Sequence, residues 1–131
     1  MSAPDAALQK AMAGALRGAN VADKKIYDRV QDGKEPLYVS FGPAQVIDDS
    51  VDCVDGYEVF QQIDVWSRAV GSVEAKTVAG QVRAALHEAE LTLAGFRLIE
   101  IRHQDTRVFA DPDGLTTHAA LSFRALIQET N

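Results

Sequence analysis

The stretch DVWSRAVGSVEAKTVAGQVRAALHEAELTL, residues 64–93, predicts a strand that ends and a helix that follows it. Gly71 interrupts the strand, Ser72 is expected to cap the helix, and Glu74 lies in the first turn, where a negative charge favours the helix dipole. Six residues at helical spacing form the apolar stripe: Ala75, Val78, Ala79, Val82, Ala85 and Leu86. Because these side chains are mostly small, we expect the helix to lie close against a sheet.

The segment before this helix, YEVFQQIDVWS (residues 57–67), has the alternating pattern of a strand. One face of this strand is expected to carry Tyr57, Val59, Ile63 and Val65, and the other Phe60 and Trp66. Apolar residues on both faces indicate a central strand that is partly covered on both sides.

The N-terminal residues predict an amphipathic helix of about four turns. Its apolar positions are Leu8, Ala11, Met12, Ala15 and Leu16. Ser2 is the expected cap, Pro4 suits the first turn and Gly18 marks the end. A short edge strand is expected over residues 26–30, followed by extended segments at LYVSFG (37–42) and AQVIDDS (44–50), interrupted at Gly42 and Pro43.

The last third of the chain predicts a long β-hairpin, with strands at residues 96–110 and 115–128 joined by DPDG. Pro112 suits the second position of the turn and Gly114 its exit. The expected apolar face comprises Leu115, Ala119, Leu121, Phe123, Ala125 and Ile127. Regular pairing would set Arg102 opposite Phe123, whereas one bulged residue between Arg102 and Val108 brings Ile99 and Ile101 onto that face.

This order of elements predicts an α+β fold. We expect an antiparallel or mixed β-sheet, with the N-terminal helix and the second helix packed on one face, ending in the long hairpin. The 131 residues show neither an internal repeat nor a linker, so a single domain spanning residues 1–131 is expected.

Composition narrows the classes of function. A formal net charge of -6 and 24% charged residues indicate a globular, acidic chain that is poorly suited to gripping nucleic-acid phosphates. Cys53 is the only cysteine, so an intrachain disulfide is excluded, and the chain contains no apolar run long enough for a membrane span.

Candidate chemistry in the sequence is weak. Asp48, Asp49, Asp52 and Asp55 cluster in DDSVDCVDG, but their spacing does not fit an EF-hand loop, so a solvated or interface loop is favoured over a metal site. The three histidines are dispersed, and Cys53 has no neighbouring base to activate it. We therefore expect no enzyme activity, no metal and no cofactor. Trp66 and Arg68, at the end of the central strand, are residue types enriched at interfaces, although a core cap and a solvated arginine are equally compatible with the sequence.

Three segments together resemble a known family: residues 38–68, residues 71–98 and residues 106–128. The chain is similar over nearly its whole length to the tail completion, or tail terminator, proteins of long-tailed phages and gene transfer agents. The resemblance implies a structural virion protein, made in the bacterial cytoplasm, that forms a six-membered ring at the head-proximal end of the tail tube. The ring would stop tube growth and join tail to head.

The resemblance also implies the partners: copies of the same chain, the tail tube protein and a head-completion or connector protein. Double-stranded DNA would pass through the lumen without specific binding, and no membrane partner is expected. Residues expected at interfaces or at the lumen are Asp48, Asp49, Asp52, Asp55, Trp66, Arg68, Arg107, Asp111 and Asp113. The alternatives are another head-tail connector, a tail tube component, or a small ligand-binding domain or enzyme using Arg68, Arg107, His103 and His118.

Overall fold

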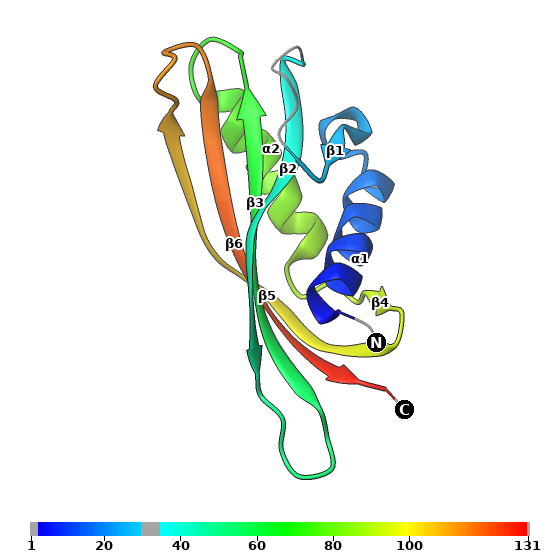
Figure 1. The fold of residues 1–131 in the computed structure, drawn as a ribbon. Coiled ribbons are helices and arrows are strands. Elements are labelled where there is room, and N and C mark those ends of the chain that lie inside the picture. The colour runs from blue at the N-terminus through cyan, green and yellow to red at the C-terminus, as the bar shows by residue number, and fades with distance from the viewer. Residues whose placement is uncertain (1–2, 30–34, 131) are drawn as a thin grey trace.

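The computed structural model describes residues 3–29 and 35–130 and contains two helices packed against one six-stranded sheet. The elements in chain order are α1 (Pro4–Gly18), the 3-10 turn η1 (Val21–Lys24), β1 (Ile26–Tyr27), β2 (Leu37–Asp48), β3 (Gly56–Ser67), α2 (Val73–Leu86), β4 (Thr92–Leu93), β5 (Phe96–Ala110) and β6 (Thr117–Glu129). Both helices lie on the same side of the sheet (Figure 1). This arrangement confirms the predicted α+β class.

The sheet is mixed, with the strand order β1-β2-β3-β6-β5-β4. The four long strands pair antiparallel, and β1 pairs parallel with β2. Since β3 pairs with β2 on one side and β6 on the other, its prediction as a central strand is confirmed. The predicted strand over residues 26–30 is indeed at an edge, but β1 ends at Tyr27, and Val30 lies outside the described residues.

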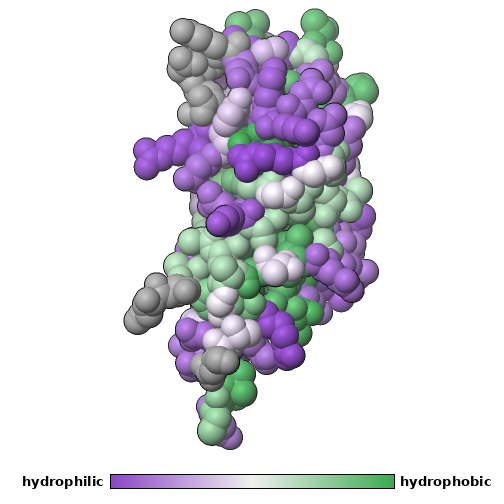
Figure 2. Space-filling model, turned by 90° about the vertical axis from the view of Figure 1, so that its right-hand side faces the viewer, coloured by the Kyte–Doolittle hydropathy of each residue, from purple (hydrophilic) through white to green (hydrophobic). Residues whose placement is uncertain are grey.

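The hydrophobic core lies between the helices and the sheet. Alternate residues of β3 point toward the helices, and Val59, Ile63 and Val65 among them are fully buried. The predicted stripe of α2 is confirmed, since Ala75, Val78, Ala79, Val82 and Leu86 are buried and Ala85 is half-buried against the core. Viewed from the α1 side, hydrophobic surface forms a band across the middle of the molecule, with polar surface above and below it (Figure 2).

The two predicted extended segments around Gly42 form one strand, β2, with a bulge between Phe41 and Ala44. A bulge leaves backbone groups without their regular partners. The buried Gln61 compensates, because its Nε2 donates to the Gly42 carbonyl at 3.1 Å. A Cβ at position 42 would lie 2.6 Å from Asp64 Oδ2, so a larger residue there would require the Asp64 side chain to shift.

The predicted caps differ from the structure. Ala3 is the N-cap residue of α1, and the expected cap Ser2 lies outside the described residues. Ser72 precedes α2 as expected, but its side chain makes no cap hydrogen bond with the residues that the structure describes. Glu74 instead accepts a hydrogen bond from the Ser67 hydroxyl at 2.7 Å, which ties the first turn of α2 to the end of β3.

The hairpin register confirms one bulge and adds another. An irregularity between His103 and Asp105 falls within the predicted range and places Ile101 opposite Ala125 in the core. A second irregularity, between Leu98 and Glu100, turns Ile99 outward, so the prediction for Ile99 is wrong. Leu115 is also wrongly assigned to the apolar face, because β6 begins only at Thr117 and Leu115 is exposed in the turn.

Candidate assembly surfaces

The sheet face that points away from the helices is called the open face below. It is formed by alternate residues of the four long strands, and strand pairing places them side by side. Its central members are Tyr38, Ser40, Gln62, Asp64, Trp66, His118, Ala120, Arg124, Arg107 and Phe109.

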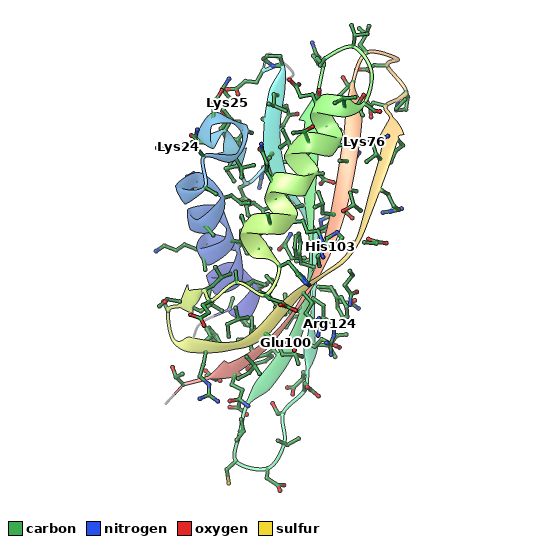
Figure 3. The ribbon with its side chains drawn as sticks, turned by 180° about the vertical axis from the view of Figure 1, so that it is seen from behind. Lys24, Lys25, Lys76, Glu100, His103 and Arg124 are labelled. Atoms are coloured by element: carbon green, nitrogen blue, oxygen red, sulfur yellow. The ribbon has the colours of Figure 1, made fainter. Side chains whose placement is uncertain are left out.

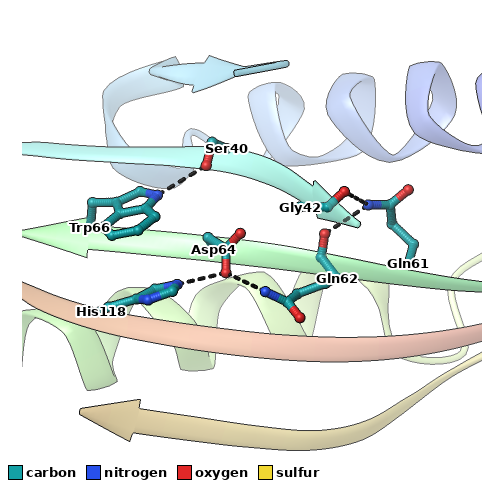
Figure 4. Close-up of polar contacts among 7 residues, drawn as sticks. All are labelled: Ser40, Gly42, Gln61, Gln62, Asp64, Trp66 and His118. Atoms are coloured by element: carbon teal, nitrogen blue, oxygen red, sulfur yellow. Dashed lines mark hydrogen bonds and ion pairs between the residues drawn. The ribbon is translucent and has the colours of Figure 1, made fainter. Parts of the chain in front are cut away.

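Aromatic rings form a row across the open face, near the end of the sheet where the turn between β5 and β6 lies. The Trp66 ring stacks on the His118 ring at a centroid distance of 3.9 Å and lies 6.3 Å from the Tyr38 ring. Phe109 meets the other side of His118 edge-on at 4.6 Å. Trp66 Nε1 also donates to Ser40 Oγ at 2.9 Å, so the indole is fixed both by stacking and by its hydrogen bond (Figure 4).

A network of polar side chains, formed by Asp64, His118 and Gln62, adjoins this row on the open face. Asp64 is 5% exposed, and its Oδ1 lies 2.6 Å from His118 Nε2 and 2.9 Å from Gln62 Nε2 (Figure 4). A carboxylate with so little contact with water requires hydrogen-bond partners, and these two side chains supply them. Asp64 therefore holds β3 and β6 in one register on the open face.

A second charged group lies further along the same strands. Arg124 forms an ion pair with Glu58 of β3 and lies 3.6 Å from Glu100 of β5, so its guanidinium bridges three neighbouring strands. Figure 3 shows Arg124 and Glu100 together near the middle of the molecule. His103, also labelled there, is on the helix side of β5, and burial together with the Arg83 charge lowers its pKa.

The predicted aspartate cluster comprises Asp48, the last residue of β2, and three aspartates of the β2–β3 connection; residues 48–55 are called the loop end below. The loop end projects from one end of the molecule (Figure 1). Hydrogen bonds from Ser50 hold the pKa of Asp48 below its ordinary value. Asp49, Asp52 and Asp55 are all exposed, and Cys53 is exposed between them.

The opposite end of the molecule is formed by the β5–β6 turn, residues 111–116, and the β3–α2 connection, residues 68–72; together they are called the hairpin end (Figure 1). The predicted turn is confirmed, because the Gly114 N–H donates to the Asp111 carbonyl at 3.0 Å. Asp113 accepts from the Leu115 and Thr116 N–H groups, and these bonds, with a contribution from the Arg68 charge, lower its pKa.

The predicted site residues thus divide between the two ends. Trp66, Arg68, Asp111 and Asp113 lie at or near the hairpin end, and Arg107 lies nearby on β5, whereas the four aspartates of residues 48–55 lie at the loop end. The sequence did not predict that Asp64 and His118 form a pair at the centre of the open face. Their signal was a charged residue inside an apolar central strand, but pairing it with His118 required the register of β3 against β6.

Among the described residues, no cluster of three or more His, Cys, Asp or Glu side chains could hold a metal ion. None of the described helices is both long and apolar enough to cross a membrane.

Comparison with known proteins gives these surfaces a context. Residues 6–128 match the family described as Tail completion protein gp17. Among solved structures, the chain is similar to a chain from the virion of a native gene transfer agent particle, with 30% identity, a TM-score of 0.88 and coverage of 98% of this chain and 99% of that one. It shares its fold with the gp17 protein of bacteriophage SPP1, at 20% identity and a TM-score of 0.61, covering 96% and 90% of the two chains. No curated protein matches the chain.

The fold and these similarities define a structural protein of a phage-type virion. The chain belongs to the tail completion protein gp17 family. The family resemblance inferred from the sequence is confirmed.

Proposed function

We propose that this protein forms a six-membered ring at the head-proximal end of a phage-type tail, where it ends growth of the tail tube and joins the tail to the head. The observation that carries the proposal is the match to a gene transfer agent virion chain over 98% of this chain at 30% identity. In this role the protein contacts its own copies, the tail tube protein and a head-completion or connector protein.

The elongated subunit supports this role. Its two ends are formed by different loops, so one end is free to contact the tube while the other contacts the head side (Figure 1). The formal net charge of -6 favours DNA passage through a lumen without tight phosphate binding, because like charges repel. A small ligand-binding domain or enzyme, by contrast, gains no specific support from the arrangement of Arg68, Arg107, His103 and His118, since His103 points to the helix side while Arg107 and His118 belong to the open face.

The proposal is tested by electron microscopy of particles from a producing strain that lacks this protein. Overlong or headless tails are expected, and expression of the wild-type chain in the same strain should restore joined particles. The number of copies per particle distinguishes a single terminal ring from a tube subunit, which would be present in many stacked rings. Normal tails joined to heads in the deletion strain would refute the proposed role.

We also propose that the loop end and the hairpin end provide contacts in the ring, toward neighbouring virion proteins or at the lumen. Their candidate residues are Asp48, Asp49, Asp52, Asp55, Trp66, Arg68, Arg107, Asp111 and Asp113. Combined charge reversal, Asp48→Lys with Asp49→Lys, should reduce the yield of joined particles by about tenfold, the effect of losing about 1.4 kcal/mol of binding free energy.

As a matched control, one charge reversal at the loop end is compared with one charge reversal at an exposed position far from it in the chain. Asp49→Lys changes only an exposed side chain, and Glu90→Lys makes the same charge change at an exposed position after α2. Counting of joined particles should show a defect for Asp49→Lys and none for Glu90→Lys. Equal yields for both variants and for the doubly substituted protein would remove the loop end from the proposed contacts.

A further inference from the structure

The outer edge of β5 is only partly covered. Among the described residues, β4 pairs with Phe96 and Arg97 alone. Further along, the Ile101 carbonyl accepts from the Glu88 N–H at 2.8 Å, and the His103 N–H donates to His87 Nδ1 at 3.0 Å. From Thr106 to Ala110, the described part of the chain offers β5 no outer partner, and Figure 3 shows this stretch with no element beyond it.

The outer edge of β2 is partly covered in the same way, at the opposite end. Within the described ranges, β1 pairs with Val39 and Ser40 only. The stretch from Ala44 to Asp48 therefore has a neighbour, β3, on one side alone. The two uncovered stretches lie on opposite edges of the sheet and at opposite ends of the strands.

The backbone groups that point outward follow from alternation along the strands. Along β5, the backbone N–H of His103 points outward, and His103 lies opposite Phe123, so the backbone groups of the residues opposite Leu121, Ala119 and Thr117 also point outward. These residues are Thr106, Val108 and Ala110. Along β2, the backbone N–H of Val39 points outward, and Val39 lies opposite Val65. The same alternation along β3 makes the backbone groups of Ala44, Val46 and Asp48 point outward.

These stretches also expose apolar side chains. Val46 and Ile47 are each 39% exposed and Phe109 is 44% exposed. Natural proteins usually protect an unpaired edge with charges, prolines or a covering loop, because such an edge can pair with another chain. Exposed apolar residues on both free edges therefore suggest a partner for each.

We propose that residues 44–48 of β2 in one subunit pair antiparallel with residues 106–110 of β5 in the next subunit, with Val46 opposite Val108. The sheet then continues from subunit to subunit around the ring. This inference rests on the proposed ring, and it specifies the contact that closes it.

The direction of the strands identifies the partner as a second copy of this chain. The four long strands alternate in direction, and their number is even, so β2 and β5 run antiparallel to each other across the sheet. A copy generated by rotation about a ring axis keeps its strand directions. Its β2 therefore meets the β5 of its neighbour in antiparallel orientation, and closure of the ring leaves no free edge.

The side chains are complementary in this register. Val46 and Val108 both point to the helix side, so the pair extends the core from one subunit to the next. On the open face, Ile47 lies opposite Arg107 and diagonal to Phe109. At the end of the pairing, Asp49 would face Asp105, and these like charges repel each other. Arg107, which forms no ion pair with the described residues of its own subunit, would lie diagonal to Asp49 and beside Asp105, where its positive charge opposes this repulsion.

The short strands fix the stagger between subunits. β1 and β4 occupy the other halves of the two edges, so pairing is possible only if neighbours are displaced along the strands. Within one subunit, strand pairing sets Val46 level with Ala125 of β6 and Val108 level with Ala119 of β6. Because these two positions are six residues apart along β6, pairing of Val46 with Val108 displaces the next subunit by six residues along the strands. At about 3.3 Å per residue this displacement is about 20 Å, against about 19 Å across four strands, which corresponds to a strand tilt of about 45°, at the upper end of the range for closed barrels.

Disulfide cross-linking in tails purified from cells that express the variant tests the pairing. In a Cys53→Ser background, Ile47→Cys with Arg107→Cys places two thiols in a non-hydrogen-bonded pair, whose Cα atoms are about 4.5 Å apart, within disulfide range. Oxidation should give a ladder of covalent multimers up to six subunits on a non-reducing gel. A second pair in the same register, Gln45→Cys with Phe109→Cys, should give the same ladder and covers the case in which the first variant fails to assemble.

The controls separate this inference from the proposed function. Each single cysteine variant should give no ladder, and the diagonal pair Ile47→Cys with Phe109→Cys should cross-link about tenfold less, because diagonal neighbours lie about 7–8 Å apart. Native mass spectrometry of the same tails reports the ring independently. A ring without cross-links for both matched pairs would overturn the edge pairing and leave the ring intact, whereas a monomer in the tails would overturn both proposals.

Discussion

Replacement of Phe123 by alanine is expected to lower the free energy of unfolding by about 3–5 kcal/mol, the usual cost of removing a buried phenylalanine. Phe123 is among the largest fully buried side chains. It lies in β6, which pairs with β3 on one side and β5 on the other, and its side chain faces the helices. Its ring meets His103 edge-on at a centroid distance of 5.5 Å, so the truncation leaves a cavity at the centre of the sheet. Equilibrium denaturation with urea measures the effect.

The neighbouring residue provides the control. Ser122 precedes Phe123 on the same strand but points to the open face. Ser122→Ala should change the unfolding free energy by less than about 0.5 kcal/mol, as is usual for substitutions outside the core. A loss below about 1 kcal/mol for Phe123→Ala would contradict the assignment of this side chain to the core.

The second large effect is expected at the polar network of the open face. Asp64→Ala should cost about 2–4 kcal/mol of unfolding free energy, because His118 and Gln62 both lose their hydrogen-bond acceptor in a site with little access to water. The loss should appear as a lower denaturation midpoint, with an unchanged slope against denaturant.

A double-mutant cycle with His118→Ala isolates the pair. The two residues are in direct contact at 2.6 Å, so a coupling free energy of about 1–2 kcal/mol is expected. Asp105→Ala, which removes an exposed carboxylate on the same face, serves as the control and should have little effect. Strict additivity of Asp64→Ala and His118→Ala would show that the contact contributes nothing to stability.

The sequence predicted the parts of the fold that depend on local pattern. Alternation in residues 57–67 located the central strand, and helical spacing of small apolar residues located α2. The DPDG turn was predictable because Pro112 and Gly114 have backbone preferences that fit their positions. The bulge near His103 was predictable because only a bulge brings Ile101 to the face that Phe123 occupies.

The features that the sequence did not predict depend on distant partners. The second bulge, at Ile99, and the hydrogen bond of Glu74 with Ser67 in place of a Ser72 cap reflect tertiary contacts that override local preference. The pairing of Asp64 with His118 joins residues 54 positions apart in the chain. It depends on the register of β3 against β6, which hydrophobic alternation alone leaves open by any even number of residues.

The bulge at Gly42 and Pro43 has a consequence for aggregation through the free edge of β2. Amyloid-like stacking needs an uninterrupted β-segment of about six residues without proline. Pro43 on one side and the end of β2 at Asp48 on the other leave only residues 44–48 on that edge. On its own, this edge of a single copy is therefore too short to template amyloid-like stacking.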